Sequence, residues 1–174
     1  MLINLSDVLT SEGRQVRESA DLEMTSFESR VGSYEIVEKS PVAFTFTNIE
    51  NGKAKVEGSV SLKLKAQCDR CLTEVPVKLD LSFERIVTSP EMTTEEEEVD
   101  DLSFMEGYQL NVETFVYNEI LGNWPAKILC REDCKGICPK CGQNLNIKDC
   151  GCDTFVPDPR MAAIQDIFNA SKEV

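Results

Sequence analysis

Eight cysteines constrain this chain more than any other feature of its sequence. They are Cys68, Cys71, Cys130, Cys134, Cys138, Cys141, Cys150 and Cys152. Six of them fall within 23 residues, and two pairs have C-x-x-C spacing, one of them far upstream of the others. A tight turn with this spacing directs two thiolates at one ion. The pattern therefore predicts metal binding that joins distant parts of the chain.

The start of the chain bears on how these cysteines are used. Residues 1–7 have no basic flank, no sustained apolar stretch and no small-residue cleavage site, so we expect a cytoplasmic protein. No apolar run is long enough for a membrane span, and no membrane contact is predicted. A reducing cytosol disfavours disulfides and leaves thiolates free to hold metal. Disulfides remain the alternative if the compartment is different.

The chain contains no histidine. Ser-His and Cys-His nucleophile pairs are therefore excluded, and a zinc ion held by four cysteines has no open position for water. Neither C-x-x-C pair begins a helix beside a parallel sheet, where redox-active thiols are found. We predict a protein that is not an enzyme, has no small-molecule substrate and holds zinc. An iron ion in a rubredoxin-like cage and thiol chemistry remain alternatives.

Zinc takes four ligands in closed sites, so eight cysteines predict two ions. The preferred partition places Cys68, Cys71, Cys130 and Cys134 in one site, and Cys138, Cys141, Cys150 and Cys152 in the other. A rival partition forms one site from Cys134, Cys138, Cys141 and either Cys150 or Cys152. Spacing alone does not decide between them.

The remaining pattern predicts an α+β fold with an antiparallel β-meander. Apolar and polar residues alternate over 42–46, 53–67 and 75–83, and Asn51-Gly52 is typical of a hairpin turn. Asn111 is placed to cap one helix near 112–122 that packs on the sheet. We predict a β-sheet domain over 1–126, and a zinc-ribbon-like segment with a C-terminal helix over 127–174. The acidic stretch 91–101 is predicted to be a solvated loop or a docking strip for a basic partner.

The net charge of −13 argues against a surface that is basic throughout. Lys53, Lys55, Lys63 and Lys65 nevertheless share one parity on a predicted strand, and Arg70 follows in the first C-x-x-C pair. These five residues are candidate contacts for the phosphates of RNA. The alternative for the basic residues among the cysteines is compensation of thiolate charge at the metal.

Three motifs together resemble a known family. They are Cys68-Asp69-Arg70-Cys71, the run from Cys134 to Asn146, and Cys150-Gly151-Cys152 followed by Asp158-Pro159-Arg160. In these the chain resembles the YceD family, the large ribosomal RNA subunit accumulation proteins of bacteria and plastids. The resemblance implies a non-catalytic role in ribosome assembly that supports accumulation of large-subunit (23S) ribosomal RNA. The partner would be that RNA or a basic ribosomal protein. An RNA-binding zinc-ribbon module of unrelated purpose and a thiol redox protein are the alternatives.

Overall fold

A computed structural model describes residues 1–30, 32–92 and 104–152 of the chain. Two helices and nine strands are formed in this part of it. In chain order they are β1 (Leu2–Asn4), α1 (Ser6–Thr10), β2 (Gln15–Ala20), β3 (Ser26–Ser29), β4 (Gly32–Lys39), β5 (Val42–Glu50), β6 (Lys53–Gln67), β7 (Glu74–Thr88), β8 (Met105–Glu106), β9 (Gln109–Asn111) and α2 (Val112–Gly122). The predicted α+β class is confirmed.

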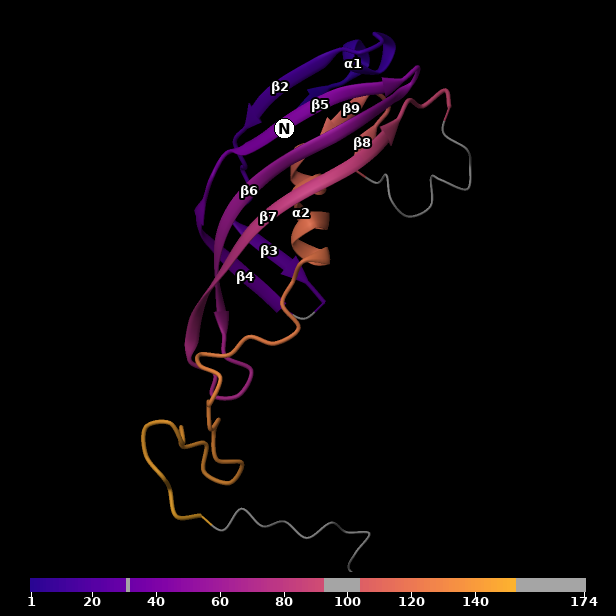
Figure 1. The fold of residues 1–174 in the computed structure, drawn as a ribbon. Coiled ribbons are helices and arrows are strands. Elements are labelled where there is room, and N and C mark those ends of the chain that lie inside the picture. Colours follow the sequence, from indigo (N-terminus) through magenta and orange to yellow (C-terminus); the bar gives the residue numbers. More distant parts are fainter. Residues whose placement is uncertain (31, 93–103, 153–174) are drawn as a thin grey trace, which may run out of the picture.

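The strand β6 organises the main sheet (Figure 1). It pairs with β7 in antiparallel register over its whole length. On its other edge β5 pairs with residues 53–59, and β4 pairs further along with residues 62–64. The predicted meander is therefore present as β5, β6 and β7, while β4 shares an edge of β6 with β5. The outer strands β2 and β3 extend the sheet beside β5 and β4.

Alternation along β6 decides which face of the sheet forms the core. The even positions from Ala54 to Ala66 are buried except for half-buried Gly58, and the odd positions are not buried. A Cβ atom on Gly58 would lie 2.1 Å from the carbonyl oxygen of Ala43 and 2.7 Å from the ring of Phe83. Glycine at this position therefore lets a large aromatic side chain fill the core.

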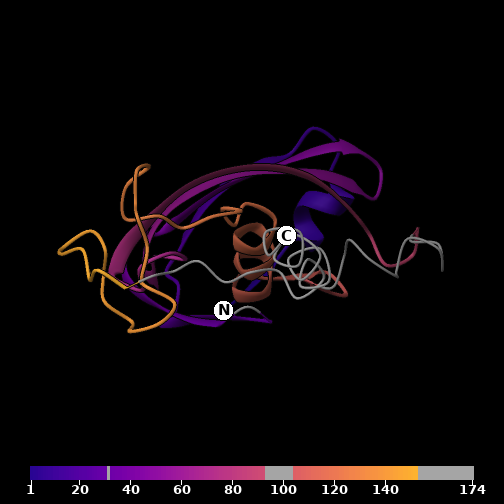
Figure 2. The same cartoon turned by 90° about the horizontal axis from the view of Figure 1, so that it is seen from below.

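The helix α2 covers the inner face of the curved sheet (Figure 2). Its N-terminus is capped as predicted, because the side chain of Asn111 accepts a hydrogen bond from the backbone N–H of Thr114 at 3.3 Å. The ring centroid of Phe115 lies 4.8 Å from that of Phe83 and 5.8 Å from that of Phe44, both edge to face. Such aromatic pairs contribute about 0.5–1.5 kcal/mol each beyond the burial of their surface.

A second, smaller sheet was not predicted. It has the order β1-β9-β8, so the first residues of the chain pair with those just before α2. The backbone N–H of Leu5 also donates to the carbonyl of Tyr108 at 2.8 Å. Strands of two or three residues are too short to show a period in the sequence, and for this reason the pattern gave no signal.

The β6-β7 hairpin extends beyond the rest of the sheet and meets the cysteine-rich segment at its tip (Figure 1). Over 127–152 this segment has turns and one isolated bridge, between Ile137 and Asn144. The predicted C-terminal helix and most of the acidic stretch lie outside the described residues, and the predicted domain boundary at 126/127 stays a prediction. No helix in the described part of the chain is long and apolar enough to cross a membrane.

Candidate metal centres

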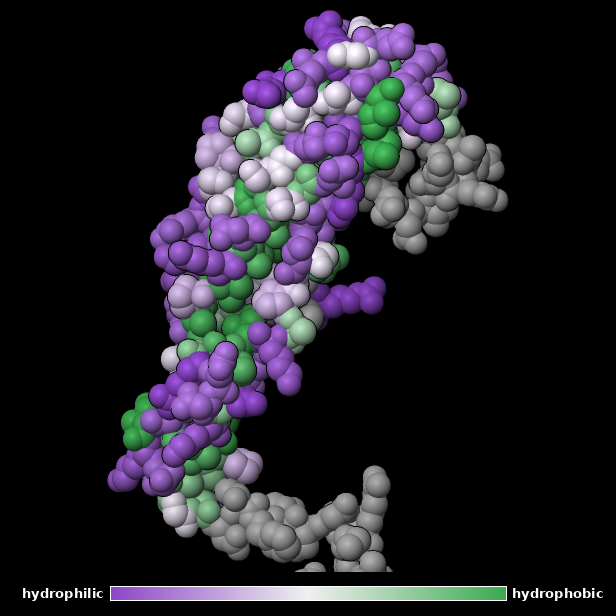
Figure 3. Space-filling model, viewed as in Figure 1, coloured by the Kyte–Doolittle hydropathy of each residue, from purple (hydrophilic) through white to green (hydrophobic). Residues whose placement is uncertain are grey.

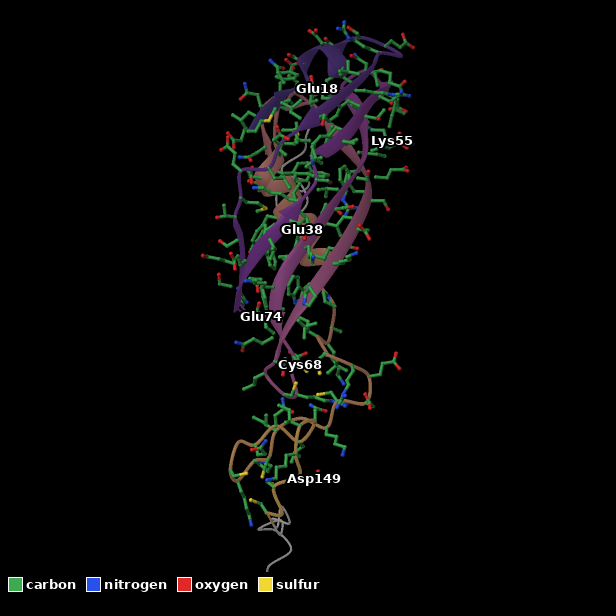
Figure 4. The ribbon with its side chains drawn as sticks, turned by 90° about the vertical axis from the view of Figure 1, so that its left-hand side faces the viewer. Glu18, Glu38, Lys55, Cys68, Glu74 and Asp149 are labelled. Atoms are coloured by element: carbon green, nitrogen blue, oxygen red, sulfur yellow. The ribbon has the colours of Figure 1, made fainter. Side chains whose placement is uncertain are left out.

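The first cysteine group comprises Cys68, Cys71, Cys130 and Cys134 (Figure 4). All four sulfur atoms lie within 4.8 Å of one another. The Sγ atoms of Cys68 and Cys134 are 3.8 Å apart, and those of Cys71 and Cys130 are 3.5 Å apart. A tetrahedron of sulfurs with Zn–S bonds of about 2.3 Å has edges of about 3.8 Å. The donor atoms and their spacing therefore fit one zinc ion.

The second cysteine group comprises Cys138, Cys141, Cys150 and Cys152. Its sulfur atoms also lie within 4.8 Å of one another. The structure thus assembles the cysteines as in the preferred partition, and Cys134 lies with the first group rather than the second. Both groups offer only sulfur ligands, which suit zinc or iron in a closed structural site.

The hairpin tip builds the first pair of ligands by a specific turn. The backbone N–H of Cys68 donates to the carbonyl of Thr73 at 2.8 Å, and the N–H of Leu72 donates back to the carbonyl of Cys68 at 2.9 Å. Leu72 has φ +59°, the left-handed region that a residue with a Cβ atom adopts at a cost of about 1–2 kcal/mol. Its side chain is 57% exposed, so packing of the leucine does not explain this conformation.

The same turn recurs in the second group. The N–H of Cys138 donates to the carbonyl of Gln143, and the N–H of Gly142 donates to the carbonyl of Cys138, both at 2.9 Å. Gly142 has φ +72° and takes the place that Leu72 has in the first turn. The C-x-x-C spacing therefore encodes one local structure twice, once at a hairpin tip and once in a loop.

Backbone N–H groups favour the thiolate of the first cysteine in each turn. Burial raises the pKa of Cys68, but hydrogen bonds from the backbone of Arg70, Cys130 and Cys71 outweigh it and lower this pKa to about 6. Hydrogen bonds from the backbone of Cys141 and Lys140 lower the pKa of Cys138, likewise to about 6. The thiolate is the form that binds metal.

Two other cysteines, one in each group, have raised pKa values instead. Burial and the neighbouring Cys134 raise the pKa of Cys130 to about 12. The nearby thiols of Cys150 and Cys141, followed by burial, raise the pKa of Cys152 to about 12. Four thiols so close together cannot all ionise without a cation, so a bound metal ion would displace protons and compensate the charge.

Comparison with known proteins gives a family. A family model described as large ribosomal RNA subunit accumulation protein YceD matches residues 56–168, which is more than half of the chain. The chain belongs to the YceD family. The match begins within β6 and ends after Cys152. It therefore leaves out the first five strands and includes both cysteine groups.

Curated relatives of this YceD-family chain come from mycobacteria. The uncharacterized protein Rv2926c of Mycobacterium tuberculosis is 25% identical over 119 residues, which cover 68% of this chain and 57% of the relative. The uncharacterized protein ML1660 of Mycobacterium leprae is 28% identical over 97 residues, covering 53% and 43%. The chain thus spans about half the length of these relatives. No solved structure matches it.

In this YceD-family chain, the tip of the β6-β7 hairpin is bound to the downstream segment on two sides. The carboxylate of Asp69 accepts a hydrogen bond from the N–H of Ile128 at 2.7 Å, and the N–H of Asp69 donates to the carbonyl of Ile128 at 2.8 Å. The guanidinium of Arg70 donates to the carbonyl of Cys134 at 2.9 Å, and the carbonyl of Arg70 accepts from the N–H of Ile137. Arg70 therefore lies beside the first cysteine group, as charge compensation requires.

Asn146 is a site residue that the sequence analysis missed. Its Nδ2 atom lies 3.2 Å from the sulfur of Cys134 and can donate to it. Its Oδ1 atom accepts hydrogen bonds at 2.8 Å from the backbone N–H of Lys135 and from the guanidinium of Arg131. A single asparagine in a loop carries no sequence signal of such a role, since only tertiary structure brings it to the first cysteine group.

The predicted lysine stripe lies on the outer face of β6, as the parity requires. Figure 3 shows that face largely covered by hydrophilic side chains over its upper half. Each of the four lysines has a glutamate within 4.0 Å. The ion pairs are Lys53 with Glu50, Lys55 with Glu57 and Glu84, Lys63 with Glu38, and Lys65 with Glu35 and Glu74.

These glutamates change the charge of the stripe. Six carboxylates surround four lysines, so the face has mixed charge rather than the basic character expected from β6 alone. Four of these glutamates lie on β4 and β7, which the register places beside β6, while Glu57 lies on β6 itself and Glu50 ends β5. Contact of these lysines with RNA stays a prediction, and it would require the ion pairs to open.

Proposed function

We propose that this protein is a non-catalytic ribosome assembly factor that supports accumulation of large-subunit (23S) ribosomal RNA and acts in the cytoplasm. The observation that carries the proposal is the family match over residues 56–168, which contains both cysteine groups. In this proposal the cysteines hold two structural zinc ions. The zinc ions give the molecule a rigid end without taking part in a reaction.

The chemistry of the two groups supports a structural role for the metal. Each group supplies four sulfur ligands, which leaves a bound zinc ion no open position for water or substrate. The first group joins the β6-β7 hairpin to residues 128–137, a connection across more than 50 residues of sequence. Zinc bound there would stabilise the arrangement of two chain segments rather than create a reactive centre.

The charges support a basic ribosomal protein over the RNA itself as the direct partner. The chain carries a net charge of −13, and glutamates surround the lysines of β6. Phosphate binding depends on lysines or arginines that are free to displace counterions. An acidic protein instead attracts a basic partner over long distances.

Depletion and complementation would test this proposal. Cells depleted of the protein should lose 23S relative to 16S ribosomal RNA and accumulate fewer large subunits in sucrose gradients. Wild type and the control variant Ser59→Ala, an exposed change on β6, should restore both. Cys68→Ser and Cys141→Ser should each purify with one zinc ion instead of two and restore the ratio less well.

Crosslinking in the same cells would identify the partner. We expect crosslinks to a basic ribosomal protein, with no change in RNA accumulation when Lys55 and Lys65 are changed to glutamate. Direct crosslinks to 23S RNA that disappear in this double variant would identify RNA as the partner instead. Normal 23S levels after complete depletion would reject the assembly role. A zinc-free protein whose thiols cycle through disulfides would indicate a redox function.

A further inference from the structure

The strand β7 has a long open edge. It pairs with β6 at every residue from Glu74 to Thr88. In the described part of the chain no strand pairs with its other edge. Figure 4 shows β7 along one border of the molecule. Such an edge presents a row of backbone N–H and C=O groups that can template pairing with another strand.

The hydrogen bonds at the two ends of the β6-β7 ladder show which residues face this open edge. The N–H of Cys68 donates to the carbonyl of Thr73 at one end, and the N–H of Ser89 donates to the carbonyl of Gly52 at the other. In an antiparallel ladder hydrogen-bonded pairs alternate with non-hydrogen-bonded pairs. Odd-numbered residues of β7 therefore bond to β6, and the even-numbered ones direct their backbone groups outward.

Two residues of β7 agree with this assignment. Pro76, which has no N–H, stands at an even position, where the ladder with β6 needs no donor. Ile86 also stands at an even position, and its side chain is 59% exposed on the outer face. Single exposed apolar residues are common on protein surfaces, and Ile86 would be covered only if another chain paired with this edge.

We propose that two copies of this chain form a dimer by antiparallel pairing of their β7 strands about a twofold axis at Leu81. In this register Lys78 lies opposite Glu84 of the second copy, and Asp80 lies opposite Ser82 of the second copy. Pro76 lies opposite Ile86 of the second copy and supplies no N–H there, so the hydrogen bonds between the copies lie within residues 78–84. Because the axis is twofold, each contact occurs twice.

The charges on the edge favour this register over the two neighbouring ones. A shift of two residues in one direction places Asp80 opposite Glu84 of the second copy, and a shift in the other places Asp80 opposite Asp80. Like charges directly opposite each other destabilise strand pairing. In the described part of the chain Lys78 has no carboxylate within 4.0 Å, although after Lys63 it also lowers the pKa of Glu38. Charged residues and proline prevent indiscriminate pairing of an edge, and of these three alignments the one centred at Leu81 places opposite charges together.

The position of α2 is compatible with the dimer. The helix packs under the upper part of β7, where Phe83 contacts Phe115 and the guanidinium of Arg85 lies 2.9 Å from the carboxylate of Glu119. Phe83 and Arg85 lie on one side of the twofold axis at Leu81. The helix of each copy is therefore centred about 10 Å from the axis along the strands, and the two helices are about 20 Å apart. Each helix is about 16 Å long, so they would not overlap. Half-buried Val75 and Val77 would lie beside the inner face of the second copy.

Sedimentation velocity of the full, metal-loaded chain over about 1–100 μM would test the dimer. We expect a concentration-dependent dimer for the wild type. Lys78→Glu and Glu84→Lys should each weaken it roughly tenfold or more, because attraction becomes repulsion at two symmetric positions. The double variant Lys78→Glu/Glu84→Lys should restore the wild-type dissociation constant. The control Glu35→Lys makes the same charge change as Glu84→Lys but on β4, which β6 separates from the open edge, and should not weaken the dimer.

A backbone variant provides an independent measurement. Ser82→Pro removes an N–H that makes no bond to β6, so the variant should fold, as judged by circular dichroism, and remain monomeric. A wild-type protein that is monomeric at 100 μM would overturn the proposal. So would a dimer that is unchanged by both single charge reversals, since its interface would lie elsewhere. The charge-swap series decides the question even if the proline variant does not fold.

Discussion

The two cysteine groups have the same ligands and the same C-x-x-C turn, yet they differ in their connection to the rest of the molecule. Three of the four cysteines in the first group are buried, and its ligands come from the β6-β7 hairpin and from a segment more than 50 residues away. In the second group only Cys138 is buried, and all four ligands lie within 15 residues of one another.

This difference indicates two roles for one kind of site. The first group fixes the position of a segment against a sheet that already has its own hydrophobic core. The second group has almost no apolar surface to bury, since Ile147 is 80% exposed and Leu145 is half-buried. Its structure must depend on the metal, as in other small metal-binding segments.

Removal of metal should have the largest effect, because it should unfold the second cysteine group and leave the sheet folded. Structural zinc contributes about 10–16 kcal/mol of apparent binding free energy, and the second group has little else to hold it together. A chelator should therefore unfold residues 136–147 while the sheet persists. Hydrogen exchange would check this, because the amides of Cys138, Gly142 and Leu145 should lose protection before those of β6 and β7. Simultaneous loss of protection in both regions would contradict the separation.

Substitution of Asn146 should have an effect of intermediate size, on the affinity of one cysteine group for its metal ion. Asn146→Ala removes the hydrogen bond to the sulfur of Cys134 and those that position Lys135 and Arg131. Loss of such a partner typically weakens metal affinity by about 10–100-fold. Competition with a chromophoric chelator should show this loss for one of the two metal ions. The adjacent variant Ile147→Ala should bind both ions normally, and equal weakening by the two variants would reject the proposed role of Asn146.

The smallest effects are expected from substitutions at the equivalent positions of the two C-x-x-C turns, Leu72 and Gly142. Leu72→Gly relieves the left-handed backbone strain at the hairpin tip, and after allowance for the entropy of glycine should stabilise the protein by about 0.5–1 kcal/mol. Gly142→Leu introduces that strain in the second turn and should destabilise it by about 1–2 kcal/mol. Denaturant unfolding measures the first change, and metal affinity of the second group measures the other. Changes of the same sign would show that the turns are not equivalent.

Much of the architecture was predictable because it depends on local periodicity. Alternation over 42–46, 53–67 and 75–83 predicted β5, β6 and β7, and Asn111 predicted the start of α2. The C-x-x-C spacing indicated two turns of one kind, since the hydrogen bonds that form such a turn lie within six residues. The family likewise followed from motifs that the sequence alone displays, and the match over 56–168 confirmed it.

What the sequence by itself could not determine depends on contacts between distant segments. Spacing left two cysteine partitions open, and the docking of Asp69 on Ile128 decided which sulfurs approach one another. Parity placed four lysines on one face, but only the register of β4 and β7 revealed four of the six glutamates beside them. Side-chain period is a property of one strand, whereas charge compensation and metal geometry are properties of neighbouring segments. The tertiary structure therefore decided the chemistry of both surfaces.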